Sequence, residues 1–155
     1  MNIDMPADPT SFVTGHVGLN VVDLDRSLEF YRGAFGFDLV GQGTGDERRW
    51  AFLGTGATPV LTLWQQADRS HAPSAAGLHH LSFMVDTVDE VQAVETRLKA
   101  LGAEFAYDGL VPHAEGAESG GIYFSDPDGI RLEIFAPSGV TGQAPHGVAP
   151  SCGLF

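Results

Sequence analysis

The apolar pattern of this chain runs through the same order of secondary structure twice. Residues 13–67 predict a strand, a helix and three further strands, and after a polar linker at 68–77 the same order returns in residues 78–136. A repeat on this scale indicates two copies of one supersecondary unit. We therefore predict an α+β fold of two βαβββ modules, flanked by a loose arm at 1–12 and a Gly/Pro-rich tail at 137–155.

Local signals mark the ends of the two predicted helices. Asp23 or Asp25 can cap the first helix, and Gly36 is well placed to end it. Thr87 and Glu90 form a Thr-x-x-Glu capping box that opens the second helix. Both helices carry an apolar stripe, so each module has one helix able to cover one face of its strands.

Composition limits the partners that such a fold can have. The formal net charge of −12 disfavours nucleic acid and anionic membrane surfaces. One cysteine, Cys152, cannot form an intrachain disulfide, which suits a reducing compartment. No apolar run approaches the roughly 20 residues that span a bilayer, and the N-terminus lacks a signal-peptide pattern. We expect a cytoplasmic protein that acts on a small molecule.

Strand alternation places ligand-type side chains at matching positions of the two modules. His16 falls on the face of the first strand opposite its apolar residues, and in the second module alternation selects His80 rather than its neighbour His79. In the last strand of the second module Glu133 lies opposite the apolar face, and Thr62 takes its place in the first module. If the modules curl around a common cavity, these side chains point into it.

Two imidazoles and one carboxylate that converge suit a divalent first-row metal. We expect Fe²⁺ first, with Mn²⁺, Zn²⁺ or Ni²⁺ as alternatives. A single strand histidine is more often a core or surface residue than a ligand, and Asp-Pro-Asp-Gly hairpins are common. Three ligand-type residues at matching positions of a repeated unit are harder to attribute to structure alone. The pattern therefore predicts one metal site, at His16, His80 and Glu133.

Three segments of the chain resemble the vicinal oxygen chelate superfamily. Residues 16–31, which begin His-Val-Gly-Leu-Asn-Val and end Ser-Leu-Glu-Phe-Tyr, resemble its opening. Residues 77–83 (Gly-Leu-His-His-Leu-Ser-Phe) and 123–133, which begin Tyr-Phe-Ser-Asp-Pro-Asp-Gly, resemble its two later signatures. The resemblance covers about residues 13–136. It implies paired modules that form a half-open mixed β-barrel cup around one metal.

By position, the three predicted ligands look like the superfamily's own, and the branches differ in what surrounds them. Glyoxalase I has a further carboxylate in the place of Thr62, and the fosfomycin-inactivating branch expects a basic cavity, in which Arg131 would be nearly alone. Bleomycin-binding proteins usually lack the metal ligands. These differences favour dioxygenase-type chemistry on a small aromatic or oxygen-chelating substrate. A glyoxalase-like lyase or isomerase acting through an enolate, and an antibiotic-sequestering binding protein, are the alternatives.

Extradiol dioxygenases use a His, His, Glu triad, and residues 111–113 together with 122–133 approach their signature. In that branch Tyr123 would donate a hydrogen bond to bound oxygen species and His113 would assist proton transfer. The strand histidine that ring-cleaving enzymes use has no clear counterpart, and His71 is a weak substitute. Cys152 is not predicted to take part in catalysis.

The remaining inward positions predict an apolar pocket wall with a few polar groups. The modules could pair within one chain or exchange across a symmetric dimer, and we expect a homodimer. The predicted pocket residues are Asn20, Thr62, Trp64, Ser82, Arg131 and Phe135.

Overall fold

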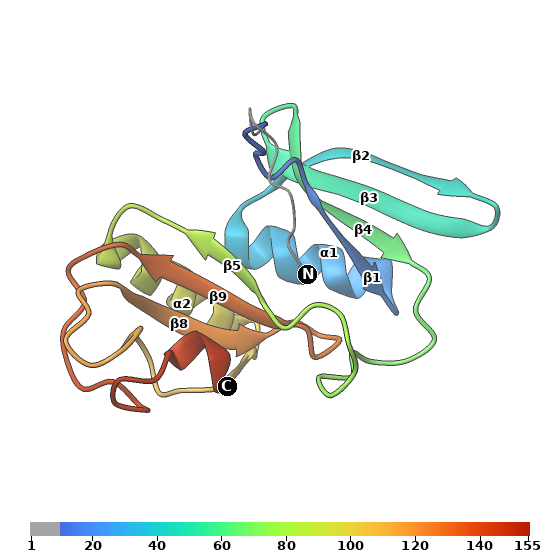
Figure 1. Ribbon diagram of the computed structural model, residues 1–155. Helices are drawn as coiled ribbons and strands as arrows, with labels where there is room; N and C mark the ends of the chain where they lie inside the picture. The colour runs from blue at the N-terminus through green and yellow to red at the C-terminus, as the bar shows by residue number, and fades with distance from the viewer. Residues whose placement is uncertain (1–9) are drawn as a thin grey trace.

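The computed structural model describes residues 10–155, and most of the predicted arm at 1–12 lies outside them. Figure 1 shows two β-sheets, each with one helix packed against it. The elements of the first module are β1 (Val17–Val21), α1 (Leu24–Phe35), β2 (Asp38–Gly45), β3 (Arg48–Thr55) and β4 (Thr58–Gln65). The second module and the tail contain β5 (Leu81–Met84), α2 (Val88–Ala100), β6 (Glu104–Phe105), β7 (Val111–Pro112), β8 (Gly120–Ser125), β9 (Arg131–Ala136) and the short 3₁₀ helix η1 (Ser151–Gly153).

The two sheets have related topologies. Strand order is β1-β4-β3-β2 in the first sheet and β5-β9-β8-β6 in the second, with β7 also paired to β8. β1 lies parallel to β4 and β5 lies parallel to β9, whereas the other pairings are antiparallel. Within the described residues the sheets are not hydrogen-bonded to each other and do not close into a barrel. This mixed-sheet α+β architecture, open like a cup, confirms the predicted fold class.

One predicted strand is wrong in its extent. The sequence pattern predicts a single strand over residues 104–111, but the structure has the two short strands β6 and β7 there, with a loop between them. Gly109 lies in that loop with φ of +72°, a conformation that interrupts an extended strand. Both short strands still pair with β8, so the second sheet keeps its place in the module.

Both helices begin at predicted capping residues, and α1 also ends at the predicted glycine. The Asp23 side chain accepts a hydrogen bond from the backbone N–H of Arg26, and Gly36 ends α1 in the left-handed conformation. Thr87 and Glu90 form the reciprocal capping box of α2. No helix in the described part of the chain is long and apolar enough to cross a membrane.

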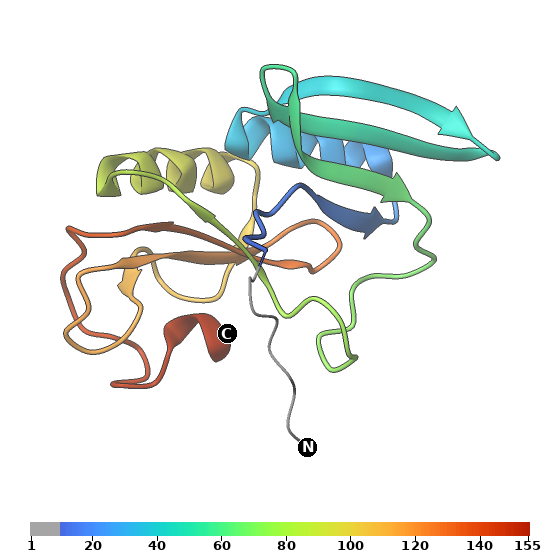
Figure 2. The ribbon, with the colours of Figure 1, turned by 45° about the horizontal axis from the view of Figure 1, so that its top comes forward.

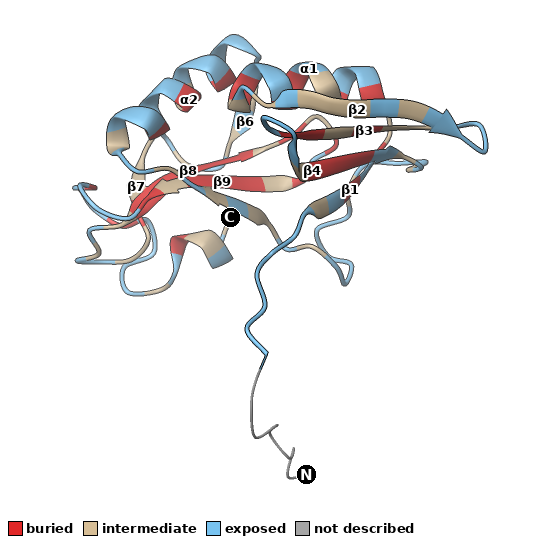
Figure 3. Cartoon of the chain, turned by 90° about the horizontal axis from the view of Figure 1, so that it is seen from above, coloured by how far each residue is buried: buried red, intermediate tan, exposed pale blue. Residues whose placement is uncertain are grey.

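The α-helices α1 and α2 cover the same side of the two sheets, and the short helix η1 lies on the opposite side of the second sheet (Figure 3). Aromatic rings join the modules beneath α1 and α2: the Phe35 ring lies 5.2 Å from that of Phe37 and 5.0 Å from that of Phe83, centroid to centroid. The turn between β8 and β9 adds a polar contact, because Tyr31 of α1 donates a 2.8 Å hydrogen bond to Asp126. The core therefore lies between these two helices and the sheets and leaves the opposite faces of the sheets available for a site.

Candidate metal centre

Strand register brings ligand-type side chains together on the face of the second sheet opposite α2. Ser82 of β5 lies opposite Glu133 of β9, and Tyr123 of β8 lies opposite Glu133 on its other side. His80 precedes Ser82 by two residues, so strand alternation turns it to the same face. Glu133 is therefore flanked by residues of both neighbouring strands.

The first sheet has the same register with different side chains. Gly18 of β1 lies opposite Thr62 of β4, and Phe52 of β3 lies opposite Thr62 on the other side. His16 precedes Gly18 by two residues, as His80 precedes Ser82. The positional correspondence between Thr62 and Glu133 therefore holds in the pairing of the strands.

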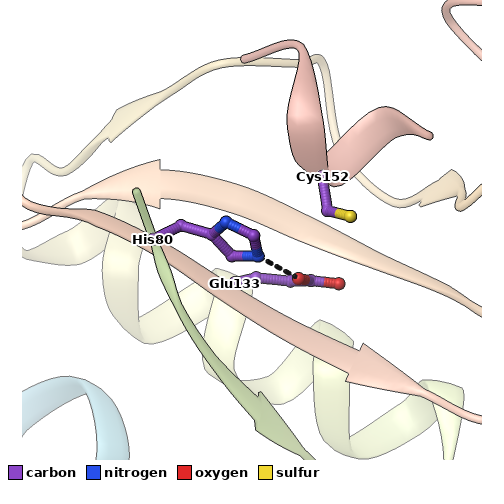
Figure 4. A group of neighbouring side chains, drawn as sticks. All are labelled: His80, Glu133 and Cys152. Carbon is purple, nitrogen blue, oxygen red and sulfur yellow. Dashed lines mark ion pairs between the residues drawn. The ribbon is translucent and has the colours of Figure 1, made fainter. Parts of the chain in front are cut away.

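Glu133 is the centre of the arrangement, since it is a carboxylate with only 3% of its surface exposed. Its Oε1 atom lies 2.5 Å from His113 Nε2 and accepts a 3.2 Å hydrogen bond from the Tyr123 hydroxyl. Its Oε2 atom lies 3.4 Å from His80 Nε2 (Figure 4). One carboxylate oxygen is thus held by protein donors while the other is turned toward His80.

The electrostatics keep these groups in forms that can act as ligands. Burial alone would raise the pKa of Glu133, but the hydrogen bond and charge of His113 outweigh burial and hold that pKa below the usual carboxyl value. Burial lowers the pKa of His80, and the nearby Glu133 offsets only part of that effect. Burial and the charge of Glu133 raise the pKa of Tyr123, so its hydroxyl stays a donor.

The spacing of His80 and Glu133 fits a shared metal ion. Two atoms bound at about 2.0–2.2 Å to one first-row ion lie roughly 3–3.5 Å apart, which matches the 3.4 Å between His80 Nε2 and Glu133 Oε2. A direct hydrogen bond between the two would be shorter. Within the described residues the structure also brings Cys152 to this pair: one ligand atom from each of the three residues lies within 4.8 Å of the others.

The structure does not bring His16 into this group. His16 is exposed at the start of β1, in the other sheet, and it is not among the ligand-type side chains clustered with His80 and Glu133. Thr62 is buried at 3% exposure and accepts a 3.1 Å hydrogen bond from Trp64 Nε1, while Trp64 itself is 36% exposed. The first sheet therefore presents an aromatic, partly open face rather than a charged one.

The other predicted pocket residues divide between the two sheets. Asn20 is exposed, and its side-chain oxygen accepts a hydrogen bond from the backbone of the residue after β4. Arg131 Nη1 lies 3.5 Å from His79 Nε2, and the Phe135 ring lies 5.1 Å from the ring of His113. Ser82 is exposed beside Glu133. Arg131, Phe135 and Ser82 thus surround the Glu133 cluster, and Asn20 does not.

Two contacts went beyond what sequence patterns could indicate. His113 was placed in a loop of uncertain exposure, yet it contacts the buried oxygen of Glu133. Cys152 was set aside as part of a tail without periodicity, yet η1 carries it to His80 and Glu133 (Figure 4). The only signal in the sequence was the presence of a single thiol, which by itself indicates nothing.

Solved structures share this fold. A glyoxylase/bleomycin resistance protein/dioxygenase domain from Frankia sp. EAN1pec superposes with a TM-score of 0.69 at 28% identity, covering 83% of this chain and 99% of that one. FosX, a fosfomycin resistance protein of Listeria monocytogenes solved with Mn(II) and sulfate, has the same fold, with a TM-score of 0.58 at 22% identity over 85% of this chain and 93% of its own.

Two curated relatives carry named activities. A probable lactoylglutathione lyase of Vibrio cholerae is 33% identical over 131 residues, which cover 77% of this chain and 86% of the relative. Catechol-2,3-dioxygenase of Bacillus subtilis is 27% identical over 124 residues, covering 79% of this chain but only 40% of the relative.

The match to a family extends over both modules. Residues 14–134 fit the profile of the Glyoxalase/Bleomycin resistance protein/Dioxygenase superfamily, from before β1 to within β9. The superfamily is mostly composed of enzymes, includes dioxygenases, lyases and resistance proteins, and has members that bind divalent metals. By fold, by the register of its two modules and by sequence, the chain belongs to this superfamily, also known as the vicinal oxygen chelate superfamily.

Proposed function

We propose that the protein is a divalent-metal-dependent enzyme with dioxygenase-type chemistry on a small aromatic or oxygen-chelating substrate. The observation that carries the proposal is the buried Glu133, whose Oε2 lies 3.4 Å from His80 Nε2 while Oε1 is occupied by His113 and Tyr123. His113 and Tyr123 bond one oxygen of this buried carboxylate, and a cation between Oε2 and His80 would give the other oxygen a charged partner. The sequence relation to a catechol dioxygenase gives further support.

His80 and Glu133 would hold the metal, with His16 as a third ligand. When bound, an Fe²⁺ ion would supply oxygen activation and a chelating point for two adjacent substrate oxygens. His113 and Tyr123 fix the orientation of Glu133 through its other oxygen, as partners behind a metal ligand usually do. His113 Nε2 lies against Glu133 and its Nδ1 lies 2.8 Å from the Ser119 hydroxyl, so His113 would exchange a proton with the substrate only after releasing one of these contacts.

The third ligand would come from a second copy of the chain. Within one chain His16 is exposed and is not among the ligand-type side chains clustered with His80 and Glu133. A symmetric dimer that places the first module of one copy over the second module of the other would complete two sites at once. We therefore expect a homodimer whose metal centre is shared between the copies.

A lyase or isomerase acting through an enolate is the second candidate. The relation at 33% identity to a probable lactoylglutathione lyase favours it. Against it stands Thr62, because the hydroxyl there is already bonded to Trp64 and is not a carboxylate that could bind metal or remove a proton. A binding protein that sequesters an antibiotic without a metal is disfavoured, because such a protein would not need His80 and Glu133 at the spacing of two metal ligands.

Oxygen-dependent turnover separates these possibilities. The protein is loaded with Fe²⁺ under anaerobic conditions, mixed with catechols, and exposed to oxygen. The proposal predicts oxygen uptake and a yellow ring-opened product, both absent in Glu133→Gln. Formation of lactoylglutathione from methylglyoxal and glutathione, without oxygen uptake, would establish the lyase instead. Tight drug binding by a metal-free protein would contradict both enzymatic readings.

Mixing two inactive variants tests the shared site. His16→Ala and Glu133→Gln would each be inactive alone. In an equal mixture about half of the dimers would carry both variants, and each of these would hold one intact site. Recovered activity therefore supports ligands contributed by two copies. A mixture as inactive as its parents, with subunit exchange demonstrated, would place all ligands within one chain.

A further inference from the structure

The C-terminal strap, residues 151–155, is docked on the face of the second sheet that α2 leaves free. Figures 2 and 3 show it on the side of the sheet opposite α2. Ser151 is fully buried: its hydroxyl donates a 2.7 Å hydrogen bond to the carbonyl of Pro112, and its N–H donates to the carbonyl of His113 at 2.8 Å. The Tyr107 hydroxyl donates to the Ser151 carbonyl at 2.9 Å. Three bonds to a buried residue fix the orientation of η1.

This docking places the next residue of the strap, Cys152, over the Glu133 cluster (Figure 4). The thiol is free, and its sulfur belongs to a group in which the ligand atoms of Cys152, His80 and Glu133 all lie within 4.8 Å of one another. Two ligands of one tetrahedral ion, one sulfur and one nitrogen, lie about 3.5 Å apart. Small side-chain rotations would close the remaining difference.

We propose that Cys152 is a further protein ligand of the metal held by His80 and Glu133, so that the C-terminal strap supplies a thiolate to the site. The inference rests on the proposed metal site and adds a donor to it. Three different parts of the chain provide the atoms: the segment before β5, strand β9 and η1. A soft sulfur donor beside nitrogen and oxygen selects Fe²⁺, Co²⁺ or Zn²⁺ over Mg²⁺ and Ca²⁺.

A thiolate from the strap would couple metal occupancy to closure of the site. The Phe155 ring at the end of the strap lies 4.9 Å from the ring of Tyr123 and 5.6 Å from that of His80, centroid to centroid. A bond from Cys152 to the metal would hold this apolar wall in place and fill one coordination position. Substrate would then occupy the coordination positions that the protein ligands leave free.

The test uses Co²⁺ as the probe, because thiolate coordination to Co²⁺ produces intense charge-transfer absorption in the near ultraviolet and the weaker visible bands report Co²⁺ bound by any donors. Metal-free full-length protein is titrated with cobalt chloride. We expect both sets of bands in the wild type, and loss of the charge-transfer absorption alone in Cys152→Ser. The matched control moves the thiol along the same tail: Val148, 87% exposed, is changed to Cys in the Cys152→Ser background. That double variant should bind Co²⁺ without charge-transfer absorption.

A second readout needs no variant, because the chain has a single cysteine. The rate of alkylation of Cys152 by iodoacetamide is measured with and without Zn²⁺. At a free metal concentration of about 100 Kd only about 1% of the sites remain empty, so alkylation should slow by about 100-fold. In Glu133→Gln the same Zn²⁺ concentration should give no such protection.

The outcomes separate this inference from the proposed function. Visible Co²⁺ bands in the wild type without charge-transfer absorption, or alkylation unchanged by saturating Zn²⁺, would overturn the role of Cys152 and leave His80 and Glu133 as ligands. Absence of any bound Co²⁺ would overturn the metal site itself, and with it the inference. Charge-transfer absorption that depends on Cys152, together with protection of the thiol, establishes the ligand.

Discussion

The two sheets of this protein share one register and differ in what they place at its centre. In the second sheet a buried carboxylate, Glu133, lies between Ser82 and Tyr123. In the first sheet a buried hydroxyl, Thr62, lies between Gly18 and Phe52. Strand pairing thus fixes where a side chain points, and the residue type at that position decides whether the sheet can bind a cation.

Thr62 and Glu133 obtain their hydrogen-bond partners from different parts of the chain. The Thr62 hydroxyl is bonded by Trp64, two residues away on the same strand. Glu133 takes His113 from a loop that has no counterpart in the first module, as well as Tyr123. A hydroxyl can be satisfied locally, whereas a buried carboxylate requires charged partners brought from outside the repeat.

We expect the largest effect on metal affinity from removing the negative charge of Glu133, the residue by which the second sheet differs from the first. Glu133→Gln keeps the size of the side chain but removes an anionic ligand, and we expect metal affinity to fall by more than the roughly 100-fold that loss of an outer partner costs at most. The matched change at the equivalent position, Thr62→Val, should leave metal affinity unchanged. Isothermal titration of metal-free protein measures both. Equal affinities in the two variants would remove Glu133 from the site.

Removing the loop partner tests whether the repeat alone can build the site. His113→Ala would leave Glu133 Oε1 with Tyr123 as its remaining partner, and we expect metal affinity to fall by about 10- to 100-fold because the carboxylate loses its orientation. Competition with a chelator of known affinity measures the change. His71→Ala, in the linker, is the control and should have no such effect. An unchanged affinity in His113→Ala would mean that the contact with His113 does not organise the site.

The junction between modules offers a comparison of stability. Tyr31→Phe removes the donor to buried Asp126, and an unsatisfied buried acceptor of this kind costs about 1–3 kcal/mol. Tyr107→Phe removes a bond to the strap at a more exposed position and should cost less. Urea unfolding of both variants at neutral pH gives the two free energies of unfolding. The reverse order of effects would contradict the assignment of Asp126 as the polar link between modules.

We expect the smallest effect on metal affinity from a substitution that gives the second sheet the residue found at the equivalent position of the first. Tyr123→Phe copies the residue at the equivalent position, Phe52, and removes a neutral donor to Glu133 at 3.2 Å. A bond of this kind contributes about 0.5–1.5 kcal/mol, so metal affinity should fall by roughly 2- to 10-fold. Phe52→Tyr, the reciprocal change, should not raise affinity. A larger loss than that of His113→Ala would show that Tyr123 is the main support of Glu133.

The internal repeat explains which parts of the fold and of the candidate site could be predicted from the sequence. Alternation identified Thr62 as the equivalent of Glu133, and local signals identified the caps at Asp23 and Thr87, because these depend on neighbouring residues. The contact of His113 with Glu133 depends on a loop held by the strand pairing and by Ser119, whose hydroxyl lies 2.8 Å from His113 Nδ1. No periodicity encodes such a contact.

The C-terminal strap is a second feature whose position local sequence patterns could not predict. Residues 151–155 reach the site through two long-range hydrogen bonds of Ser151, from its hydroxyl to the carbonyl of Pro112 and from its backbone N–H to the carbonyl of His113. The composition of the tail therefore allowed either a strap or a flexible end, and tertiary contacts decide in favour of the strap. The position of Cys152 beside Glu133 follows from that docking and from nothing in the local sequence.

The most direct test of the central claim is the metal content of three proteins prepared side by side. Wild type, His80→Ala and His71→Ala are loaded with Fe²⁺, freed of excess metal, and analysed for iron per chain. His71 lies in the linker and is not among the ligand-type side chains clustered with His80 and Glu133, so it controls for the loss of one imidazole elsewhere in the chain. A shared site at His80 and Glu133 predicts stoichiometric iron in wild type and His71→Ala, and its loss in His80→Ala. Iron retained in His80→Ala at the wild-type level would contradict the account.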